Sequence, residues 1–284
     1  MIPLLSANLF RLRRDPLLWL ALGVCLAGSA AFSASFRDTP SFDDVYFFPF
    51  CVALCAFLSL FLGREYGDGT LRNKVAAGFR RWEIYLAYFL TALVVDLCLL
   101  AAFLLPFALA NGPALAGLAG ERLALVLLGV VLLTVAMTAL LTAVSCCVSH
   151  WAVGVMVNLG LWFFLMFGAY QVSFALGQPA YVTELSVDDQ GNVVESDPIP
   201  NPNYLGQPLR TLAEGVEACL PHGQLNTYVS YLTHYFYVQS EGLDPAETGW
   251  EDESFLTRSP LCALAVTAGV TAVGLTVFRK KDLK

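Results

Sequence analysis

The stretch that decides the architecture of this chain is residues 63–90, which read GREYGDGTLRNKVAAGFRRWEIYLAYFL. This stretch is charged and rich in glycine, and it lies between two long apolar runs. Asp68 is a suitable N-cap for a helix that begins near Gly69, and Gly78 suits the left-handed position after a helix. We therefore predict a short helix of about nine residues, roughly 14 Å long, in a loop between two membrane spans.

The composition is that of a membrane protein. Of the 284 residues, 57% are hydrophobic and 14% are charged, and the mean hydropathy is +0.64, which is too apolar for an ordinary soluble domain. The net charge of −7 implies no nucleic-acid partner. Only Cys219 of the eight cysteines lies in a long polar loop, so we do not expect an intramolecular disulfide.

Six apolar runs are long enough to cross a bilayer as helices, which predicts an all-α polytopic membrane protein. They cover about residues 17–36, 46–62, 85–110, 123–148, 153–176 and 255–278.

Residues 1–15 predict a basic amphipathic helix that lies on the membrane surface. Leu5, Leu9 and Leu12 recur at helical spacing, and Asn8 and three arginines surround them. The alternative is that this segment opens a signal peptide. We favour an uncleaved first span, because the apolar run continues to about residue 36 and five further spans follow.

The basic residues predict the orientation, because Lys and Arg near span ends are retained in the cytoplasm. One side of the six spans carries twelve of the sixteen basic residues, which are Arg11, Arg13, Arg14, Arg64, Arg72, Lys74, Arg80, Arg81, Arg279, Lys280, Lys281 and Lys284. The other side has Arg37, Arg122, Arg210 and Arg258, and its longest loop, 177–254, carries thirteen acids. We expect both termini to be cytoplasmic and the acidic loop to face outward.

The outer loop 177–254 is long enough to hold structure of its own. Residues 181–187 and 193–194 flank a glycine-containing turn and predict a β-hairpin, and the four prolines that follow predict an irregular chain. Helices are expected at 209–220 and 224–238. The second of these is rich in tyrosine, and it either dips into the outer leaflet or packs as a cap on its neighbours.

Several kinds of chemistry are excluded by the motifs that the chain lacks. It has no Gly-x-x-x-x-Gly-Lys-Ser/Thr loop, so it is not itself an ATPase. It has no His-Glu-x-x-His and no Gly-x-Ser-x-Gly, and an intramembrane hydrolase would need a paired nucleophile and base that the sequence does not offer. We read the adjacent Cys146 and Cys147 as packing residues. We expect no catalytic residue, no metal and no cofactor bound by this chain.

Three polar residues inside the apolar runs are candidates for a transport pathway. Asp96 lies near the middle of the third run, where an ionised carboxylate costs about 2.5 to 3.5 kcal/mol on insertion scales. It is either a cavity-lining or gating residue or a hydrogen-bonded packing group. Asn158 and Gln171 in the fifth run are weaker signals, because neutral amides commonly bond across helices.

Residues 65–74, EYGDGTLRNK, resemble the loop between spans two and three of type-2 ABC exporter permeases. That family often shows an acid, a Gly-Thr-Leu-Arg run and a Gly-x-x-Arg before the next helix, which residues 78–81 supply here. The ending 278–284, FRKKDLK, looks like the common C-terminus of the family, and the basic N-terminus is similar to its interfacial connecting helix. The arrangement of six spans, cytoplasmic termini and a large outer loop is similar over the whole chain. Only this loop and the C-terminal tail resemble the family as sequence motifs.

The resemblance implies a permease subunit of the bacterial cytoplasmic membrane. It implies a transmembrane domain over 1–176 with a coupling loop at 63–84, an extracellular subdomain over 177–254, and a sixth span with a basic tail over 255–284. It also implies a second permease subunit, identical or related, and two separate ATPase subunits that hold ATP and Mg. The residues expected to couple to the ATPase are Glu65, Asp68, Gly69, Thr70, Arg72, Asn73, Lys74, Gly78, Arg80 and Arg81.

The leading hypothesis is therefore an ATP-driven exporter of a peptide antibiotic or a lipid-like substrate. The alternative is a non-transporting membrane sensor or immunity protein, which would capture cationic peptides through the acidic outer loop.

Overall fold

The chain is a helical, multi-pass membrane protein. The computed structural model describes residues 1–35, 47–118, 120–183, 185–187, 193–195, 197–243 and 253–281. Within these residues the helices are α1 (Ile2–Arg14), α2 (Pro16–Ser35), α3 (Phe48–Gly67), α4 (Thr70–Ala76), α5 (Arg81–Gly117), α6 (Gly120–Cys147), α7 (Trp151–Leu176), α8 (Leu209–Cys219), α9 (Pro221–Ser240) and α10 (Phe255–Lys280). Six of them, α2, α3, α5, α6, α7 and α10, are long and apolar enough to cross a membrane.

The spanning helices lie where the apolar runs predict them, but α3 and α5 are longer than the runs. α3 continues five residues beyond the predicted end, so Glu65 belongs to a helix and not to the loop. Hydropathy marks only the apolar part of a helix, whereas the helix itself continues through residues 64–66 because they contain no glycine or proline. α5 likewise begins at Arg81, four residues before its apolar run.

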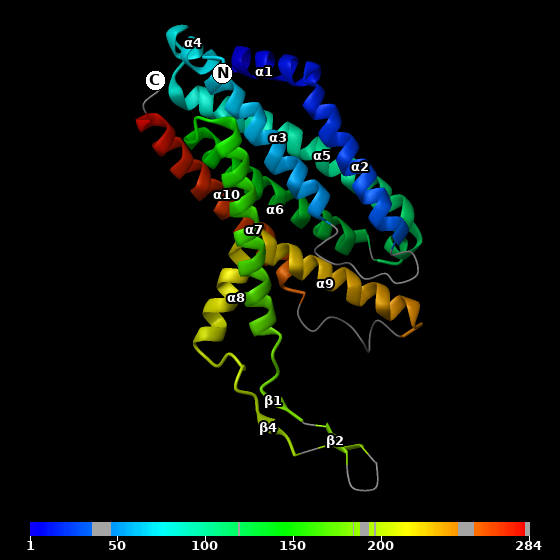
Figure 1. The fold of residues 1–284 in the computed structure, drawn as a ribbon. Coiled ribbons are helices and arrows are strands. Elements are labelled where there is room, and N and C mark those ends of the chain that lie inside the picture. Colours follow the sequence, from blue (N-terminus) through cyan, green and yellow to red (C-terminus); the bar gives the residue numbers. More distant parts are fainter. Residues whose placement is uncertain are drawn as a thin grey trace.

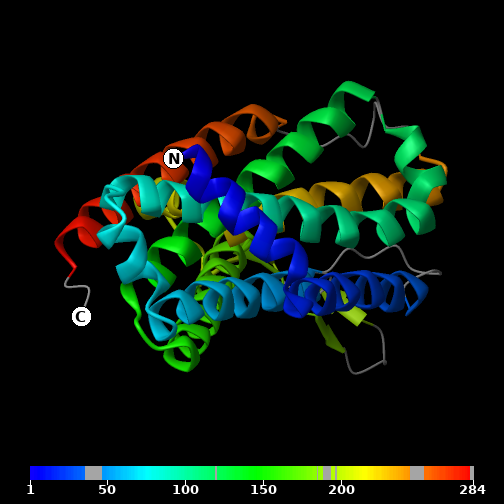
Figure 2. The same cartoon turned by 90° about the horizontal axis from the view of Figure 1, so that it is seen from above.

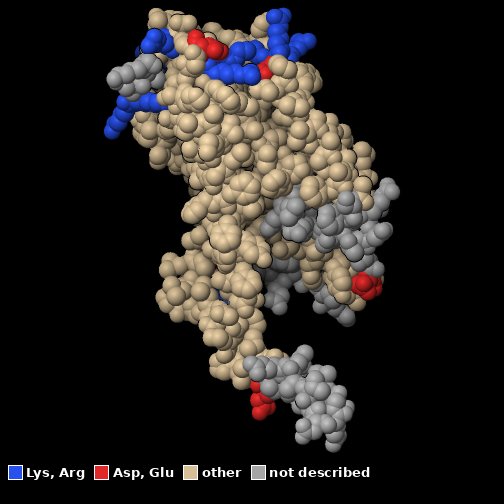
Figure 3. Space-filling model, in the orientation of Figure 1, with Lys and Arg blue, Asp and Glu red and all other residues tan. Residues whose placement is uncertain are grey.

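The short helices α1 and α4 lie at one end of the bundle, close to both termini (Figure 1). Seen from that end, α1 lies across the bundle beside α4 (Figure 2). Eleven of the twelve basic residues expected on one side are described, and all eleven lie on α1, α4 or the adjoining ends of α3, α5 and α10. Figure 3 shows Lys and Arg gathered there, and we call this end the basic end.

α1 contacts the protein through a face that the sequence pattern did not predict. Leu4, Asn8 and Leu12 are buried, while Leu5 and Leu9 are only half-buried. Asn8, which the pattern places among the polar residues around the leucines, is therefore part of the buried face. The reason is that Asn8 has polar partners on the bundle, which a count of leucines cannot reveal.

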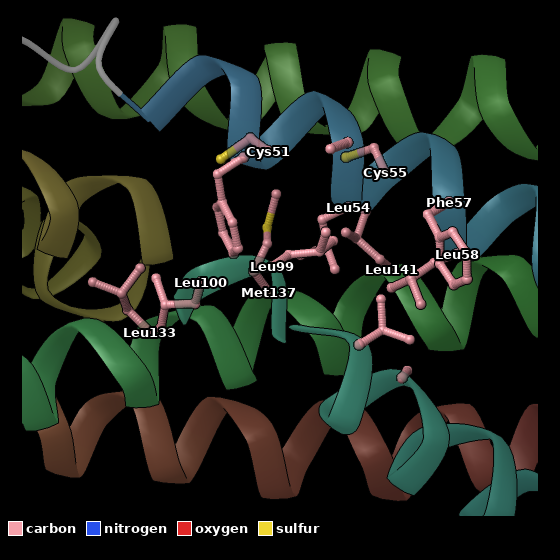
Figure 4. Packing of buried hydrophobic residues seen from close by; sticks show 14 of the residues in the cluster. Cys51, Leu54, Cys55, Phe57, Leu58, Leu99, Leu100, Leu133, Met137 and Leu141 are labelled. Carbon is pink, nitrogen blue, oxygen red and sulfur yellow. The ribbon is translucent and has the colours of Figure 1, made fainter. Parts of the chain in front are cut away.

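The centre of the bundle is filled by side chains from α3, α5 and α6. Figure 4 shows Leu54 of α3 facing Met137 and Leu141 of α6, with Leu99 of α5 beside them. Each of these side chains is 7% exposed or less. α10 packs along α6, α2 along α5, and α7 along α3, so the three central helices are flanked by three outer ones.

The end opposite the basic end is covered by α9, which crosses beneath the bundle (Figure 1). Tyr228, Tyr231 and Phe236 are each 3% exposed or less, so α9 is a cap packed on its neighbours. Contact with α6 is close, since a Cβ added at Gly129 would lie 1.9 Å from the Tyr228 hydroxyl. This burial is what the cap alternative for the tyrosine-rich helix predicts.

Two pairs of short strands extend beyond α8. β2 (Leu185–Val187) pairs antiparallel with β3 (Val193–Glu195) at the place where the sequence predicts a hairpin, but the turn at 188–192 lies outside the described residues. β1 (Tyr181–Val182), at the start of the first predicted hairpin strand, pairs instead with β4 (Ile199–Pro200), which lies in the stretch predicted to be irregular. A proline can end an edge strand in this way because its missing N–H faces away from the partner.

Candidate functional site

The best-defined polar site is a buried carboxylate at the basic end. Glu65, near the end of α3, has a side chain that is 1% exposed. Its Oε1 forms an ion pair with Arg11 of α1. Its Oε2 accepts hydrogen bonds from Lys74 Nζ at 2.8 Å, Tyr88 OH at 2.8 Å and Thr70 Oγ1 at 2.7 Å. One carboxylate therefore connects α3 to α1, α4 and α5.

Lys74 makes the second set of connections in this cluster. Its ammonium donates to Asn8 Oδ1 of α1 at 3.1 Å and to Tyr88 OH of α5 at 3.2 Å, in addition to Glu65. Asn8 in turn donates from Nδ2 to Thr91 Oγ1 of α5 at 3.3 Å. We call the following residues the Glu65 cluster: Glu65, Lys74, Tyr88, Asn8, Arg11 and Thr70.

The charges of the Glu65 cluster oppose any separation of the helices that carry them. Burial lowers the pKa of the Lys74 ammonium, and the nearby Glu65 carboxylate opposes that shift. Removing one partner of a buried ion pair leaves the other charge uncompensated, which typically costs about 3 to 5 kcal/mol. Displacement of α4 alone would separate Lys74 from Glu65, so α4 is expected to move together with the helices that share the cluster.

The turns on either side of α4 are set by two glycines. Gly69 is the N-cap of α4, with φ of 66°, and Gly78 follows the helix with φ of 89°. Gly78 N donates to Val75 O at 3.0 Å and Phe79 N donates to Lys74 O at 3.3 Å, which together close the helix as a Schellman motif. The left-handed position predicted for Gly78 is confirmed.

The predicted N-cap at Asp68 is wrong. Asp68 is instead the residue after α3, and its N–H donates to Arg64 O at 2.9 Å. The chain reverses at Gly69, and Thr70 uses its hydroxyl to bond back to Glu65. α4 therefore has seven residues and not about nine. A cap preference cannot distinguish the end of one helix from the start of the next when only two residues separate them.

α4 has one face fixed to the protein and one face exposed. Leu71 is buried at 3% exposure, and Lys74 and Val75 are half-buried. The exposed face carries Arg72 and Asn73. Asp68, in the preceding turn, is also exposed, so both signs of charge are present beside an amide on a small, ordered surface.

Two further contacts hold neighbouring elements at the basic end. Asp15, between α1 and α2, pairs with Arg64 of α3 at 3.2 Å and accepts from Leu17 N at 3.0 Å. Arg81, the first residue of α5, donates to the carbonyl oxygen of Arg279 in α10 at 2.9 Å. Arg80 precedes it as an exposed N-cap, and its backbone N–H donates to Glu83 Oε2 at 2.9 Å.

Lys281 joins the end of α10 to the end of α6. Its ammonium donates to the carbonyl oxygens of Cys147 at 3.0 Å and Cys146 at 3.2 Å. These are the last two carbonyls of α6, where the helix dipole favours a positive charge. The ammonium also lies 4.1 Å from the ring centroid of Tyr66.

The three intramembrane candidates do not lie together. Asn158 of α7 is fully buried and donates to Ser59 Oγ of α3 and Ser145 Oγ of α6, both at 2.7 Å, so it bonds across helices. Gln171 lies on an exposed part of α7. Asp96 of α5 is fully buried and faces α6.

Sequence reasoning missed Asn8, Arg11 and Tyr88 as members of the Glu65 cluster. A signal for Asn8 is present, because it lies at four-residue spacing between Leu4 and Leu12, which both become buried. Arg11 and Tyr88 carry no such signal, since arginine is common on amphipathic helices and tyrosine is common near span ends.

We compared the chain with known proteins at the levels of family, sequence and structure. No protein-family model, curated protein or solved structure matches it.

Proposed function

We propose that this chain is the membrane-spanning permease subunit of an ATP-driven exporter and that α4 is its coupling helix. The observation that carries the proposal is the Glu65 cluster, which fixes the inner face of α4 to α1, α3 and α5 through one buried carboxylate. A separate ATP-binding-cassette ATPase, present in two copies, would hold ATP and Mg. A second permease subunit would complete the assembly.

The two faces of α4 suit this role. The exposed face, with Asp68, Arg72 and Asn73, offers charges of both signs for docking to a complementary protein groove. An anionic lipid surface would instead favour a face of Lys and Arg alone. On the inner face, the cluster would pass a push on α4 to α1 and to the long helix α5.

The two ends of the bundle support an orientation in the membrane and a class of substrate. The concentration of Lys and Arg supports a cytoplasmic position for the basic end and for both termini, in a bacterial cytoplasmic membrane. At the α9 end, a cavity of about 170 Å³ lies between α5, α6 and α9 and is lined by side chains such as Phe103, Val126 and Leu225. This lining supports an apolar group on the substrate, as in a lipid-like molecule or an apolar peptide.

The test is co-purification in lipid nanodiscs with an ATP-binding-cassette ATPase encoded near this protein in its host. We expect the ATPase to co-purify and Arg72→Glu to reduce the bound ATPase at least about tenfold, which corresponds to about 1.4 kcal/mol. Arg14→Glu is the matched control, because Arg14 is exposed on α1 at the end away from α4 and undergoes the same change of charge (Figure 1).

Two outcomes would overturn the proposal. In one, the protein purifies without an ATPase and binds cationic peptides, which would favour the sensor or immunity hypothesis. In the other, Arg72→Glu and Arg14→Glu weaken ATPase binding equally, which would mean that α4 is not the docking element.

A further inference from the structure

Asp96 lies near the middle of α5 and is 0% exposed. Thr134 and Thr138 of α6 face its carboxyl group. Neither carboxyl oxygen has a hydrogen-bond partner of normal geometry among the residues that the structure describes. Buried polar atoms in folded proteins are nearly always bonded to protein or to ordered water, so an ordered water molecule beside the two threonines would complete the contacts of this carboxyl.

Among the residues that the structure describes, no cation faces that carboxyl. The helices packed against α5 are α1, α2, α3, α6, α9 and α10. Their charged residues all lie at or near helix ends, and they are Arg11, Arg13, Arg14, Arg64, Glu65, Glu121, Arg122, Arg258, Arg279 and Lys280. The titratable group beside Asp96 is Cys51 of α3. An ionised carboxylate here would be a buried charge without compensation, so the stable form is the neutral acid.

A row of hydroxyl groups leads from Asp96 toward the basic end. Thr134, Thr138, Thr142 and Ser145 follow one another along one face of α6 at spacings of four, four and three residues, and each is 2% exposed or less. The hydroxyls of Thr138 and Thr142 have no hydrogen-bond partner in the described part of the chain. Four residues of helix span about 6 Å, a gap that one water molecule can bridge between hydroxyls.

A small cavity continues this row toward the α9 end. It has a volume of about 20 Å³ and lies between α3, α6 and α9, with Cys51, Thr134 and His222 among its lining residues. That volume is enough for about one water molecule. His222 is 5% exposed, and burial lowers its pKa to about 4, so the imidazole is neutral near pH 7 and offers a polar ring edge to the cavity.

We propose that Asp96 is a proton-binding site at the centre of a water-containing file, which runs along α6 from Ser145 to the cavity at His222. The site exchanges one proton with water, the carboxylic acid becoming a carboxylate when the proton leaves, and no other reactant is needed. Thr134 and Thr138 are positioning residues, because they face the carboxyl where the two halves of the file meet. The inference goes beyond the proposed exporter function and does not require an ATPase.

The experiment is infrared spectroscopy of the full-length protein in nanodiscs. At pH 7 we expect the carbonyl stretching band of a protonated carboxyl group, which Asp96→Asn abolishes. After transfer to D2O, the downshift of this band reports how fast water reaches the proton. We expect the double variant Thr134→Val, Thr138→Val to slow that exchange about tenfold, as a barrier higher by about 1.4 kcal/mol would. Thr267→Val in α10, whose hydroxyl bonds to its own helix, should leave it unchanged.

Three results would overturn the proposal. One is the absence of a band that depends on Asp96, which would mean that the carboxylate is ionised. Another is an exchange rate that the double threonine variant does not change. The third is loss of the band when Na⁺ or K⁺ is added at constant pH, which would indicate a metal-cation site. If Asp96→Asn fails to fold, a hydrophobic carbodiimide, which adds to protonated buried carboxyls, assigns the site on the wild-type protein by peptide mass spectrometry.

Discussion

Glu65 and Asp96 are both buried carboxyl groups, 1% and 0% exposed, yet their surroundings are opposite. Glu65 lies at the basic end between Arg11 and Lys74 and accepts three hydrogen bonds on one oxygen. Asp96 lies in the middle of the bundle, where the described residues offer it hydroxyl groups but no cation. The comparison teaches that burial alone does not determine the state of a carboxyl group, because the counter-charge available to it decides whether the ionised or the neutral form is favoured.

The largest expected effect on the free energy of unfolding comes from replacing each of the two carboxyl groups by its neutral amide isostere. Glu65→Gln leaves Arg11 and the half-buried Lys74 without their shared anion, so we expect a loss of about 3 to 5 kcal/mol in the free energy of unfolding. Asp96→Asn replaces a neutral acid by a neutral amide and should change that free energy by less than about 1 kcal/mol. Unfolding by SDS in mixed micelles measures both variants. Equal losses would mean that the two carboxyls carry the same charge.

A pH titration extends the comparison to His222, a buried group at the α9 end. Burial lowers its pKa to about 4, against 6.5 for the ordinary side chain, so the unfolded chain takes up the proton first as the pH falls. The contribution of His222 to the free energy of unfolding is therefore at its full value above about pH 6.5 and declines between pH 6.5 and 4. Below pH 4 it no longer changes, and the total loss is about 3 kcal/mol. His222→Phe, measured over the same pH range, should remove that component of the slope. An unchanged slope would mean that His222 is accessible to protons in the folded state.

The smallest effect concerns an ion pair that is only partly buried. Asp15 is 7% exposed but its partner Arg64 is 46% exposed, so water screens their attraction. We expect a coupling energy of about 0.5 to 1 kcal/mol from a double-mutant cycle with Asp15→Asn and Arg64→Met. The cycle also cancels the separate loss of the hydrogen bond that Leu17 N donates to Asp15 Oδ1. A coupling energy of about 3 kcal/mol, the upper end for residues in contact, would show that exposure does not weaken this ion pair.

Much of the fold could be predicted because a membrane imposes long apolar helices. The six spans follow from hydropathy, and the left-handed glycine after α4 follows from the steric freedom of glycine. The misplaced N-cap at Asp68 and the predicted second span, which ended five residues too early, have one common cause. Charged residues can extend a helix beyond the bilayer, and neither hydropathy nor cap preference marks where such an extension ends.

The candidate site could be predicted only in part for a related reason. Glu65, Thr70 and Lys74 lie within ten residues of one another, so the loop sequence alone points to them. Asn8, Arg11 and Tyr88 come from two other helices and complete the cluster only when α1 and α5 are packed against α3. The role of the cluster in coupling is a proposal, and it rests on the docking of an ATPase to α4 that the Arg72 experiment tests.

The sequence by itself determined the class of the protein, the number of spans and the gathering of basic residues on one side, because these depend on the solvation of each segment separately. Only the tertiary structure decided which buried polar groups meet. Glu65 finds two cations and Asp96 finds threonines, although each is a single acid beside an apolar run. The physical reason is that the energy of a buried charge depends on neighbours a few ångströms away, and in a helical bundle most of those neighbours are distant in sequence.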